Sequence, residues 1–260
     1  MPFHAKAPAR LYFRVDGHPD RPLLVLGNSL GTDVFMWDRQ MEALTAHYRV
    51  LRMDTRGHGA SDAGPTDPGI EDLAGDVLAV VDTLQVERFH YCGLSLGAMV
   101  GQWLAIHAAH RLHRLVLSSA AAHLPSHESW TQRMSLVRRE GMAALVDAVM
   151  PRFFSQAYLD RNEAFLQSMR TSFLATPPQG YAACCAAIRD ADFRPHLKDI
   201  AVPTLVIGGA FDTATPADVY GQALHEGIPA AYWALLQAGH IANVEQPDAF
   251  NRTVLEFLRA

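Results

Sequence analysis

The sequence has little cysteine and little net charge, and each shortage excludes a class of protein. Only three of the 260 residues are cysteines (Cys92, Cys184 and Cys185), and they form neither a C-x-x-C motif nor the spacing of a secreted disulfide framework. The formal net charge is −5 and no basic run occurs, which argues against a nucleic-acid partner. The longest uncharged apolar stretch, 94–106, contains glycine and is too short to cross a bilayer. We therefore expect a reduced, cytoplasmic protein with no nucleic-acid or membrane partner.

The overall composition is that of an ordinary globular protein. Hydrophobic residues make up 49% of the chain and charged residues 19%. This length suits one large domain, with room for an inserted subdomain. The stretch 1–10 lacks the apolar core of a secretory leader, so we expect none there. The sequence leaves the oligomeric state open, a homo-oligomer included.

Short apolar runs alternate with longer helical patterns, which predicts an α/β fold with a mostly parallel central sheet. Continuous apolar runs are typical of strands that are covered on both faces. The predicted strands are Leu23–Leu26, Arg49–Met53, Phe89–Cys92, Leu115–Leu117, Thr204–Ile207 and Ala231–Leu235. The predicted flanking helices are Val34–Ala46, Ile70–Leu84, Leu96–His110, Pro216–Gly227 and Pro247–Leu258.

This alternation stops between residues 122 and 192, where no strand-like run occurs. The segment shows amphipathic helical patterns, with Pro151, Pro177 and Pro178 as expected breakers. We predict a helical cap (122–192) inserted into a core formed by residues 1–121 and 193–260. The helical patterns are Ser129–Glu140, Met142–Val149, Leu159–Ala175 and Tyr181–Ala191. Such a cap would lie above the strand ends, where open α/β sheets bind ligands.

Ser95 is the candidate nucleophile. It lies in Gly93-Leu94-Ser95-Leu96-Gly97, a G-x-S-x-G motif with an apolar strand before it and an apolar helical pattern after it. A serine on such a strand-to-helix turn has its hydroxyl exposed above the sheet, and small neighbours allow the tight turn. The alternative is a structural serine in a tight turn, which the flanking elements make the weaker interpretation.

The candidate base and acid are His240 and Asp212, which follow Ser95 in the order Ser, Asp, His. His240 comes just after the last predicted strand, and a solvated loop histidine is the alternative. Asp212 follows the strand Thr204–Ile207, whereas the other usual position for the acid, after Leu115–Leu117, holds no carboxylate. The alternative interpretation of Asp212 is a structural one, in which its side chain caps the helix that starts at Thr215–Pro216.

Three further histidines, His58, His107 and His110, are interpreted as loop or helix-surface residues without a chemical role.

An oxyanion hole needs two N–H donors. One should be the backbone N–H of Leu96, the residue after the nucleophile. The second should come from the loop Gly27-Asn28-Ser29-Leu30-Gly31 after the first strand, where Leu30 is our choice, and a plain turn is the alternative.

Over almost its whole length the chain resembles the α/β-hydrolase family. The stretch Met53-Asp54-Thr55-Arg56-Gly57-His58-Gly59-Ala60-Ser61 is similar to the family's D-x-R-G-x-G-x-S loop. The resemblance implies a structural role there, with Asp54 and Arg56 bracing the turn near the oxyanion loop.

Several motifs resemble more closely the 3-oxoadipate enol-lactonases within that family. They include Asn28-Ser29 in the oxyanion loop, Gly239-His240-Ile241-Ala242-Asn243 around the base, and Trp130-Thr131-Gln132-Arg133 in the cap. Ser95-Leu96-Gly97-Ala98 departs slightly from the usual pattern, in which a Met and a second Gly are expected, and position 96 contributes only its backbone to the chemistry. The resemblance implies hydrolysis of a small lactone that carries a carboxylate, without metal or organic cofactor.

Such a substrate needs a cation in the cap, and Arg133 is our hypothesis, with Trp130 as an apolar wall. Arg138 and Arg139 are the fallback cations, and a solvated helix residue is the alternative for Arg133.

Two competing functions stay open. One is a general carboxylesterase or cofactor-free perhydrolase with the same triad, and the other is a ligand receptor built on a hydrolase scaffold. A carboxylate nucleophile, as in dehalogenases and epoxide hydrolases, is disfavoured by Ser95.

Overall fold

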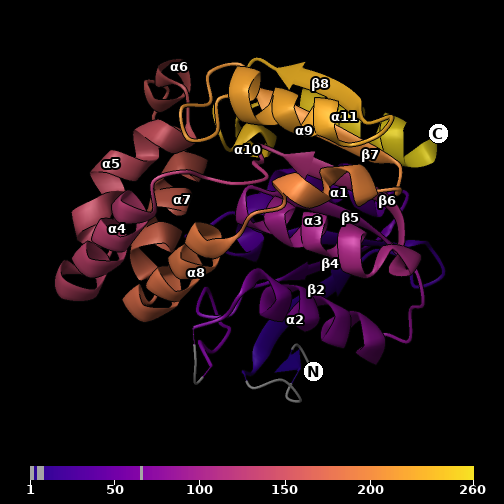
Figure 1. Cartoon of the computed structure of the whole chain (residues 1–260), viewed down its shortest axis with the longest axis horizontal. Helices are drawn as coiled ribbons and strands as arrows, with labels where there is room; N and C mark the ends of the chain where they lie inside the picture. Colours follow the sequence, from indigo (N-terminus) through magenta and orange to yellow (C-terminus); the bar gives the residue numbers. More distant parts are fainter. Residues whose placement is uncertain (1–2, 5–8, 65–66) are drawn as a thin grey trace.

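An eight-stranded sheet forms the centre of the computed structural model, which describes residues 3–4, 9–64 and 67–260 (Figure 1). The strand order is β1-β2-β4-β3-β5-β6-β7-β8. From β4 to β8 all neighbouring strands are parallel, whereas β2 is antiparallel to β4 and β1 to β2. The predicted α/β fold with a mostly parallel sheet is confirmed. The strands are β1 (Phe3–His4), β2 (Leu11–Asp16), β3 (Leu23–Gly27), β4 (Arg49–Met53), β5 (Phe89–Leu94), β6 (Leu112–Ser118), β7 (Thr204–Gly209) and β8 (Tyr232–Leu236).

The two antiparallel strands at one edge, β1 and β2, were not predicted. β2 lies near the edge of the sheet, and only its first residue, Leu11, is fully buried. Its charged residues Arg14 and Asp16 break the apolar run that marks the interior strands. Residues 1–2 and 5–8, most of the stretch for which we expect no leader, lie outside the described residues.

Helices cover both faces of the sheet, and some of the predicted helices are divided. The segment 34–46 forms the 3₁₀ helix η1 followed by α1, and 216–227 forms the π-helix η4 followed by α9. The core helices are η1 (Val34–Gln40), α1 (Met41–Thr45), α2 (Ile70–Thr83), α3 (Leu96–His107), η2 (Ala109–Arg111), η3 (Arg194–Asp199), η4 (Ala217–Gly221), α9 (Gln222–Gly227), α10 (Ala242–Glu245) and α11 (Pro247–Arg259). Across the described ranges, no helix has the length and apolar character to cross a membrane.

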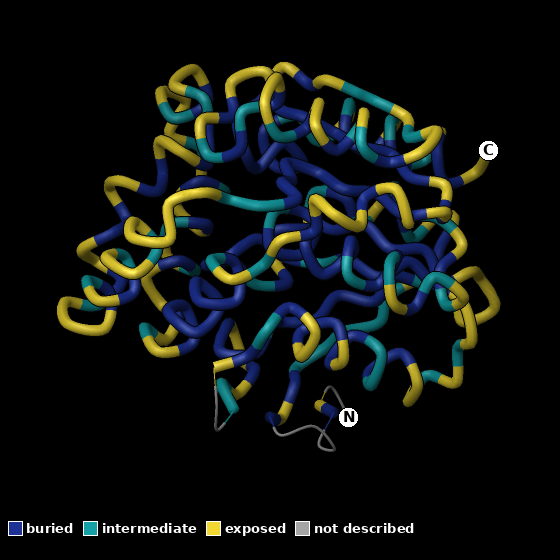
Figure 2. Tube along the Cα trace, in the orientation of Figure 1, coloured by how far each residue is buried: buried dark blue, intermediate teal, exposed yellow. Residues whose placement is uncertain are grey.

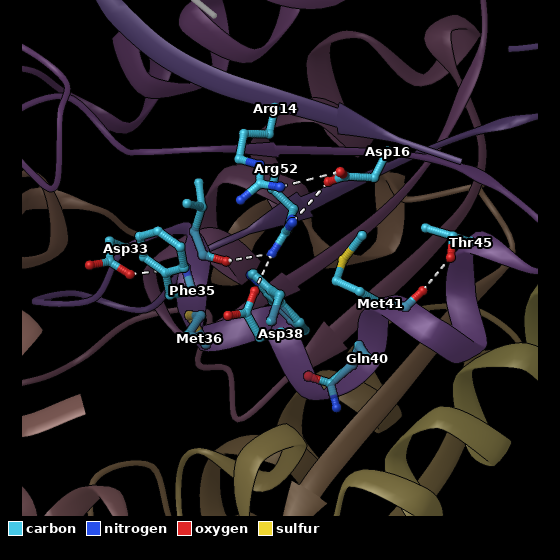
Figure 3. Close-up of polar contacts among 12 residues, drawn as sticks. Arg14, Asp16, Asp33, Phe35, Met36, Asp38, Gln40, Met41, Thr45 and Arg52 are labelled. Carbon is cyan, nitrogen blue, oxygen red and sulfur yellow. Dashed lines mark hydrogen bonds and ion pairs between the residues drawn. The ribbon is translucent and has the colours of Figure 1, made fainter. Parts of the chain in front are cut away.

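A buried arginine on β4 fixes η1, the helix that follows the predicted oxyanion loop (Figure 3). The Arg52 side chain is only 3% exposed and forms ion pairs with Asp16 at 2.8 Å and Asp38 at 2.6 Å. It also donates a hydrogen bond to the Val34 carbonyl at 3.3 Å. Three elements (β2, β4 and η1) are therefore joined through one guanidinium group beside the predicted oxyanion loop.

Between β6 and β7 the chain is helical, and we call residues 122–192 the cap segment. Its helices gather beside one end of the sheet, at the left of Figure 1, and their outward sides are exposed in Figure 2. They are α4 (His127–Glu140), α5 (Ala143–Phe153), α6 (Gln156–Leu159), α7 (Ala164–Ala175) and α8 (Pro178–Asp190). At the base of the segment, the Phe193 N–H donates to the Ala122 carbonyl at 2.8 Å. That the cap segment is a separate folding unit stays a prediction.

One predicted helix breaker is wrong: Pro151 lies inside α5, which continues to Phe153. Proline removes one intrahelical hydrogen bond, here to the carbonyl four residues earlier, at Asp147. Asp147 is exposed, so water can satisfy that carbonyl. The helix therefore extends past Pro151 and adds Arg152 and Phe153 to the face that looks toward the site.

Two glycines bring the cap segment and the core into backbone contact. Gly57 follows β4 with φ of +74°, and Gly180 lies in α8. A Cβ atom placed on either residue would overlap the backbone of the other. Because no side chain fits there, α8 lies directly on the loop that carries the D-x-R-G motif.

Candidate active site

A cavity lies between the core and the cap segment. It brings together Ser95, His240, Leu30, Trp130 and Arg133, five of the seven residues predicted for the site. Asp212 lies directly behind His240, and Leu96 is buried at the first residue of α3.

Ser95 lies at the turn between β5 and α3 in a strained backbone conformation, with φ of 55° and ψ of −110°. For a residue with a side chain, this conformation is costly and is typically kept at functional positions. The turn is held by the Ser95 N–H, which donates to the Ser118 carbonyl at 3.0 Å, and by the Gly97 N–H, which donates to the Asn28 carbonyl at 2.9 Å.

The flanking glycines have the structural role that the motif predicts. A Cβ atom on Gly97 would overlap the backbone of Gly27 at the end of β3, and one on Gly93 would overlap the Gly97 carbonyl. The turn can therefore close tightly enough to present the Ser95 side chain to the cavity.

Asp212 and His240 form a buried pair. The His240 Nδ1 to Asp212 Oδ2 distance is 2.8 Å, and the Thr215 hydroxyl donates to the same oxygen at 2.8 Å. The other oxygen, Oδ1, accepts the N–H groups of Ala214 and Thr215 at 2.8 and 2.9 Å. Burial raises the pKa of Asp212, but the His240 charge and these hydrogen bonds outweigh it, so the net pKa lies below the ordinary value. The carboxylate is thus held ionised beside the imidazole, and it also caps the turn as the alternative interpretation supposed.

His240 is only 3% exposed and is held from several sides. Its carbonyl accepts the Ser119 hydroxyl at 2.7 Å, and its ring stacks on Phe153 of α5 with centroids 6.1 Å apart. Just before it, the Gly239 N–H donates to Glu245 Oε2 at 2.9 Å, and the same oxygen accepts the Ser155 N–H from the cap segment at 3.1 Å. The base therefore lies on a loop that is tied to both the core and the cap segment.

Among the described residues, no hydrogen bond joins the Ser95 hydroxyl to the His240 ring, although both line the cavity. In this kind of site, the serine–histidine bond is often long until a substrate is present. The described residues also contain no group of three or more His, Cys, Asp or Glu placed to hold a metal ion.

The loop after β3 is shaped for an oxyanion donor at Leu30. The Asn28 side chain donates to the Met53 carbonyl and accepts from the Trp37 indole, both at 2.9 Å. The next N–H after Leu30, that of Gly31, donates to His58 Nε2 at 3.0 Å. The Leu30 N–H itself has no acceptor in the described part of the chain, and Leu30 lines the cavity.

His58 lies in a loop, as one of the two interpretations has it, but its side chain is fully buried rather than at the surface. Its Nδ1 lies 3.3 Å from the Arg56 carbonyl, which fixes the tautomer with Nε2 free to accept the Gly31 N–H. Burial lowers the pKa of His58 to about 4, so the ring is neutral at pH 7. His107 and His110 are exposed, as predicted.

The other half of the D-x-R-G loop braces the same region, in agreement with the resemblance. Asp54 Oδ1 accepts the Val34 N–H at 2.8 Å, and Oδ2 accepts the Ala60 N–H at 2.9 Å. Arg56 forms a buried two-bond ion pair with Asp76 at 2.6 and 2.7 Å. Burial raises the pKa of Asp54 to about 6, despite these two hydrogen bonds.

His58 should make the protein less stable in acid. Its pKa is about 4 in the folded state and 6.5 in an ordinary environment, so the unfolded chain binds the proton first as the pH falls. The stability that neutral His58 contributes is present above pH 6.5 and is lost as the pH falls toward 4. We expect the free energy of unfolding of the wild type, relative to His58→Gln, to fall by about 3 kcal/mol over this range.

Urea unfolding of both proteins at several pH values between 7 and 4.5 tests this prediction. Asp54 titrates in the opposite sense in the same window, but it is present in both proteins and cancels in the difference. His107→Gln, at an exposed position, is the matched control. A difference between wild type and His58→Gln that does not change with pH would contradict the prediction.

The predicted cap cation Arg133 lies in the cavity wall, whereas the two fallback residues do not. Arg133 packs over the Trp130 ring at 5.1 Å and donates to the Tyr181 hydroxyl at 3.3 Å. Arg138 pairs with Asp67 at 3.2 Å and Arg139 with Glu140 at 2.7 Å, both exposed and outside the lining. The hypothesis that Arg138 or Arg139 binds the substrate carboxylate is therefore wrong.

A second arginine in the lining, Arg152, was missed by the sequence analysis. Its signal was the spacing of Val149, Arg152 and Phe153, which places three side chains on one helix face. Pro151 conceals that signal, because a proline inside a helical pattern usually predicts the end of the helix.

Comparison with known proteins agrees with this architecture. Residues 22–247 match the family model for the alpha/beta hydrolase fold. The chain is 38% identical over 245 residues to 3-oxoadipate enol-lactonase 2 of Acinetobacter baylyi, covering 94% of this chain and 91% of that protein. The crystal structure of the enol-lactonase from Burkholderia xenovorans LB400 matches with a TM-score of 0.97 and 44% identity, covering 100% of both chains. A relative from Agrobacterium fabrum, provisionally named the carbamate hydrolase RutD, is 31% identical over 95% of this chain and 98% of its own.

Proposed function

The chain belongs to the alpha/beta hydrolase fold family and is a hydrolase of the ester type, and we propose that it hydrolyses the lactone ring of 3-oxoadipate enol-lactone to 3-oxoadipate. The observation that carries this proposal is the buried Asp212–His240 pair beside Ser95, in a cavity whose cations are arginines of the cap segment. The similarity to the two enol-lactonases supports the substrate. We place the reaction in bacterial aromatic catabolism and, with three buried free cysteines, in the cytoplasm.

The proposed reaction begins with His240 and Ser95. His240 Nε2 removes the Ser95 proton as Oγ attacks the lactone carbonyl, and Asp212 stabilises the imidazolium that forms. His240 then gives this proton to the ring oxygen as the ring carbon–oxygen bond breaks, and the enol that forms relaxes to a ketone. Water attacks the acyl-enzyme as the neutral His240 takes its proton, and His240 returns that proton to Ser95 Oγ as the acid is released. No metal or organic cofactor takes part.

In this mechanism the negative charge of the tetrahedral intermediate falls on the carbonyl oxygen. The backbone N–H groups of Leu30 and Leu96 are the proposed donors. Leu96 is the first residue of α3, so its N–H has no intrahelical acceptor, and the positive end of the helix dipole lies at the same place. Because both donors are main-chain groups, they are fixed before the substrate arrives.

Arg133 and Trp130 are the proposed substrate-binding residues. A guanidinium group can bind a carboxylate with two hydrogen bonds, and partial burial reduces the screening of the charges. Trp130 is half-buried and carries the Arg133 side chain on its ring, so it can serve as the apolar wall. A small-molecule lactone with a free carboxylate is thus the expected partner.

A direct assay tests the proposed function. Loss of the enol-lactone absorbance in the ultraviolet should be rapid with the wild type, and kcat/KM should exceed that for a p-nitrophenyl ester of similar acyl length by at least about tenfold. A preference for the nitrophenyl ester would favour a general carboxylesterase. Release of peracid from acetate and peroxide would favour a perhydrolase, and turnover of a carbamate would favour the activity for which the Agrobacterium relative is named. A single slow turnover with a persistent adduct would favour a receptor.

A further inference from the structure

Arg152 lies where α5 faces the cavity. Val149, Arg152 and Phe153 all line the cavity, at the spacing that places side chains on one face of a helix. Phe153 stacks on the ring of His240. Arg152, the residue before Phe153, thus brings its guanidinium group to the cavity wall that also contains His240, the proposed base. Because Arg152 is exposed as well as part of the lining, it lies where the cavity opens to solvent.

Arg152 has no carboxylate partner in the described ranges, unlike most arginines nearby. On the outside of the cap segment, Arg138, Arg139 and Arg170 each pair with an aspartate or glutamate. The Arg152 side chain is exposed in part, but its guanidinium group is partly withdrawn from water at the cavity wall, and this burial lowers its pKa. The positive charge of Arg133 lowers the pKa further, while the charge of Asp212 acts in the opposite sense. The two guanidinium groups therefore repel each other when no anion lies near them.

The rest of the cavity wall does not neutralise these charges. Besides the two arginines, the ionisable residues among those lining the cavity are His240 and Tyr181. Burial raises the pKa of Tyr181 to about 12, so its hydroxyl stays neutral. The one nearby carboxylate, Asp212, is already bound to His240 and Thr215. Among the described lining residues there is thus no free negative charge opposite the two arginines, and an anionic ligand would supply one.

We propose that Arg152 and Arg133, from two different helices, together bind the free carboxylate of the substrate. This inference rests on the proposed function, in which the substrate is an acyl compound with a carboxylate at some distance from the reacting carbonyl. When the carboxylate is bound, each guanidinium group is attracted to its negative charge, and this attraction offsets the repulsion between Arg133 and Arg152. Arg152, at the opening, meets the anion first, and Arg133 holds it against Trp130. Esters without a carboxylate bind without this contribution.

The test uses two esters of the same acid, monomethyl adipate and dimethyl adipate, which differ in whether the far end carries a charge. For Arg152→Gln we expect kcat/KM on monomethyl adipate to fall about tenfold or more, mainly through KM, because a charge-assisted contact is lost. The loss on dimethyl adipate should be at least about fivefold smaller. Arg133→Gln should show the same selectivity, and Arg152→Lys should recover part of the loss. Arg139→Gln, on the outside of α4, is the matched control and should leave both activities unchanged.

A second measurement separates binding from folding. An arginine that supports the fold would lower the melting temperature when replaced, whereas Arg152→Gln should leave it unchanged or raise it, because a like-charge repulsion is removed. Adipate should raise the melting temperature of the wild type and raise that of Arg152→Gln much less. Equal losses on both esters, or a lower melting temperature without ligand, would overturn the inference.

The outcome also distinguishes this inference from the proposed function. If the wild type does not hydrolyse the enol-lactone but shows the charge selectivity through Arg152, the substrate proposal fails and the two-arginine site stands. If the enol-lactone is hydrolysed but Arg152→Gln loses both esters equally, the function stands and the two-arginine site fails.

Discussion

Replacing Ser95 by alanine should lower kcat for the enol-lactone and for simple esters by about 10⁵- to 10⁶-fold. The reason is that the covalent route is closed, so only the oxyanion donors and the binding contacts remain to assist attack by water. The fold should survive, because alanine keeps the Cβ atom and the turn at φ of 55° is held by main-chain hydrogen bonds of residues 95 and 97. The melting temperature should therefore change by no more than about 2 °C.

Ser168→Ala is the matched control for this experiment. Ser168 is exposed on α7, and its hydroxyl donates only to a carbonyl of its own helix, at Ala164. Kinetics should be followed together with the acyl-enzyme burst on a p-nitrophenyl ester, which Ser95→Ala should abolish. Retention of more than about 1% of the wild-type kcat in a protein free of contaminating esterase would mean that another group attacks the carbonyl.

Replacing Asp212 by asparagine should lower kcat by about 10⁴-fold with little change in stability. The Oδ1 atom of asparagine can still accept the N–H groups of Ala214 and Thr215, so the turn is kept. At the other position, an NH₂ group would replace the oxygen that lies 2.8 Å from His240 Nδ1. The amide would then donate to Nδ1 and leave the proton on Nε2, where the ring cannot accept the Ser95 proton.

Asp218→Asn, at an exposed position in η4, is the control and should keep wild-type kinetics. The comparison also tests the alternative interpretation of Asp212 as a cap. If Asp212→Asn loses less than about tenfold in kcat, the carboxylate serves the turn around Thr215 and another group orients His240.

The sequence predicts the parts of this site that depend on local backbone order. Ser95 is defined by a five-residue turn between an apolar strand and an apolar helix, and both flanking elements lie where they were expected. Asp212 and His240 each follow a strand of the parallel sheet, so the fold brings them to the same edge. The chain order of the three residues then fixes their arrangement without knowledge of side-chain packing.

The parts that were missed depend on contacts between distant segments. His58 accepts a hydrogen bond from Gly31, which lies in another loop, and nothing in its own neighbours shows that it is buried. Arg152 enters the cavity because α5 continues through Pro151, and that depends on the exposure of the affected carbonyl. Strands near the edge of the sheet are hard to predict for a related reason. A half-exposed strand such as β2 tolerates charged residues, so its apolar pattern is weak.

The contact between Gly57 and Gly180 bears on how enzymes with this architecture can change their substrate range. Since α8 touches the core backbone to backbone, mutations that shift this helix would also disturb the loop from Gly57 to His58, and through it the Gly31 N–H. By contrast with a free helix, α5 is also tied to the core: the Phe153 carbonyl accepts the Ile241 N–H at 2.9 Å, and the Phe153 ring stacks on His240. Shifts of α8 or of the end of α5 should therefore disturb the proposed catalytic residues together with the cavity wall. A new acyl group is thus better accommodated by replacing single side chains, such as Arg133 or Arg152, than by moving these helices.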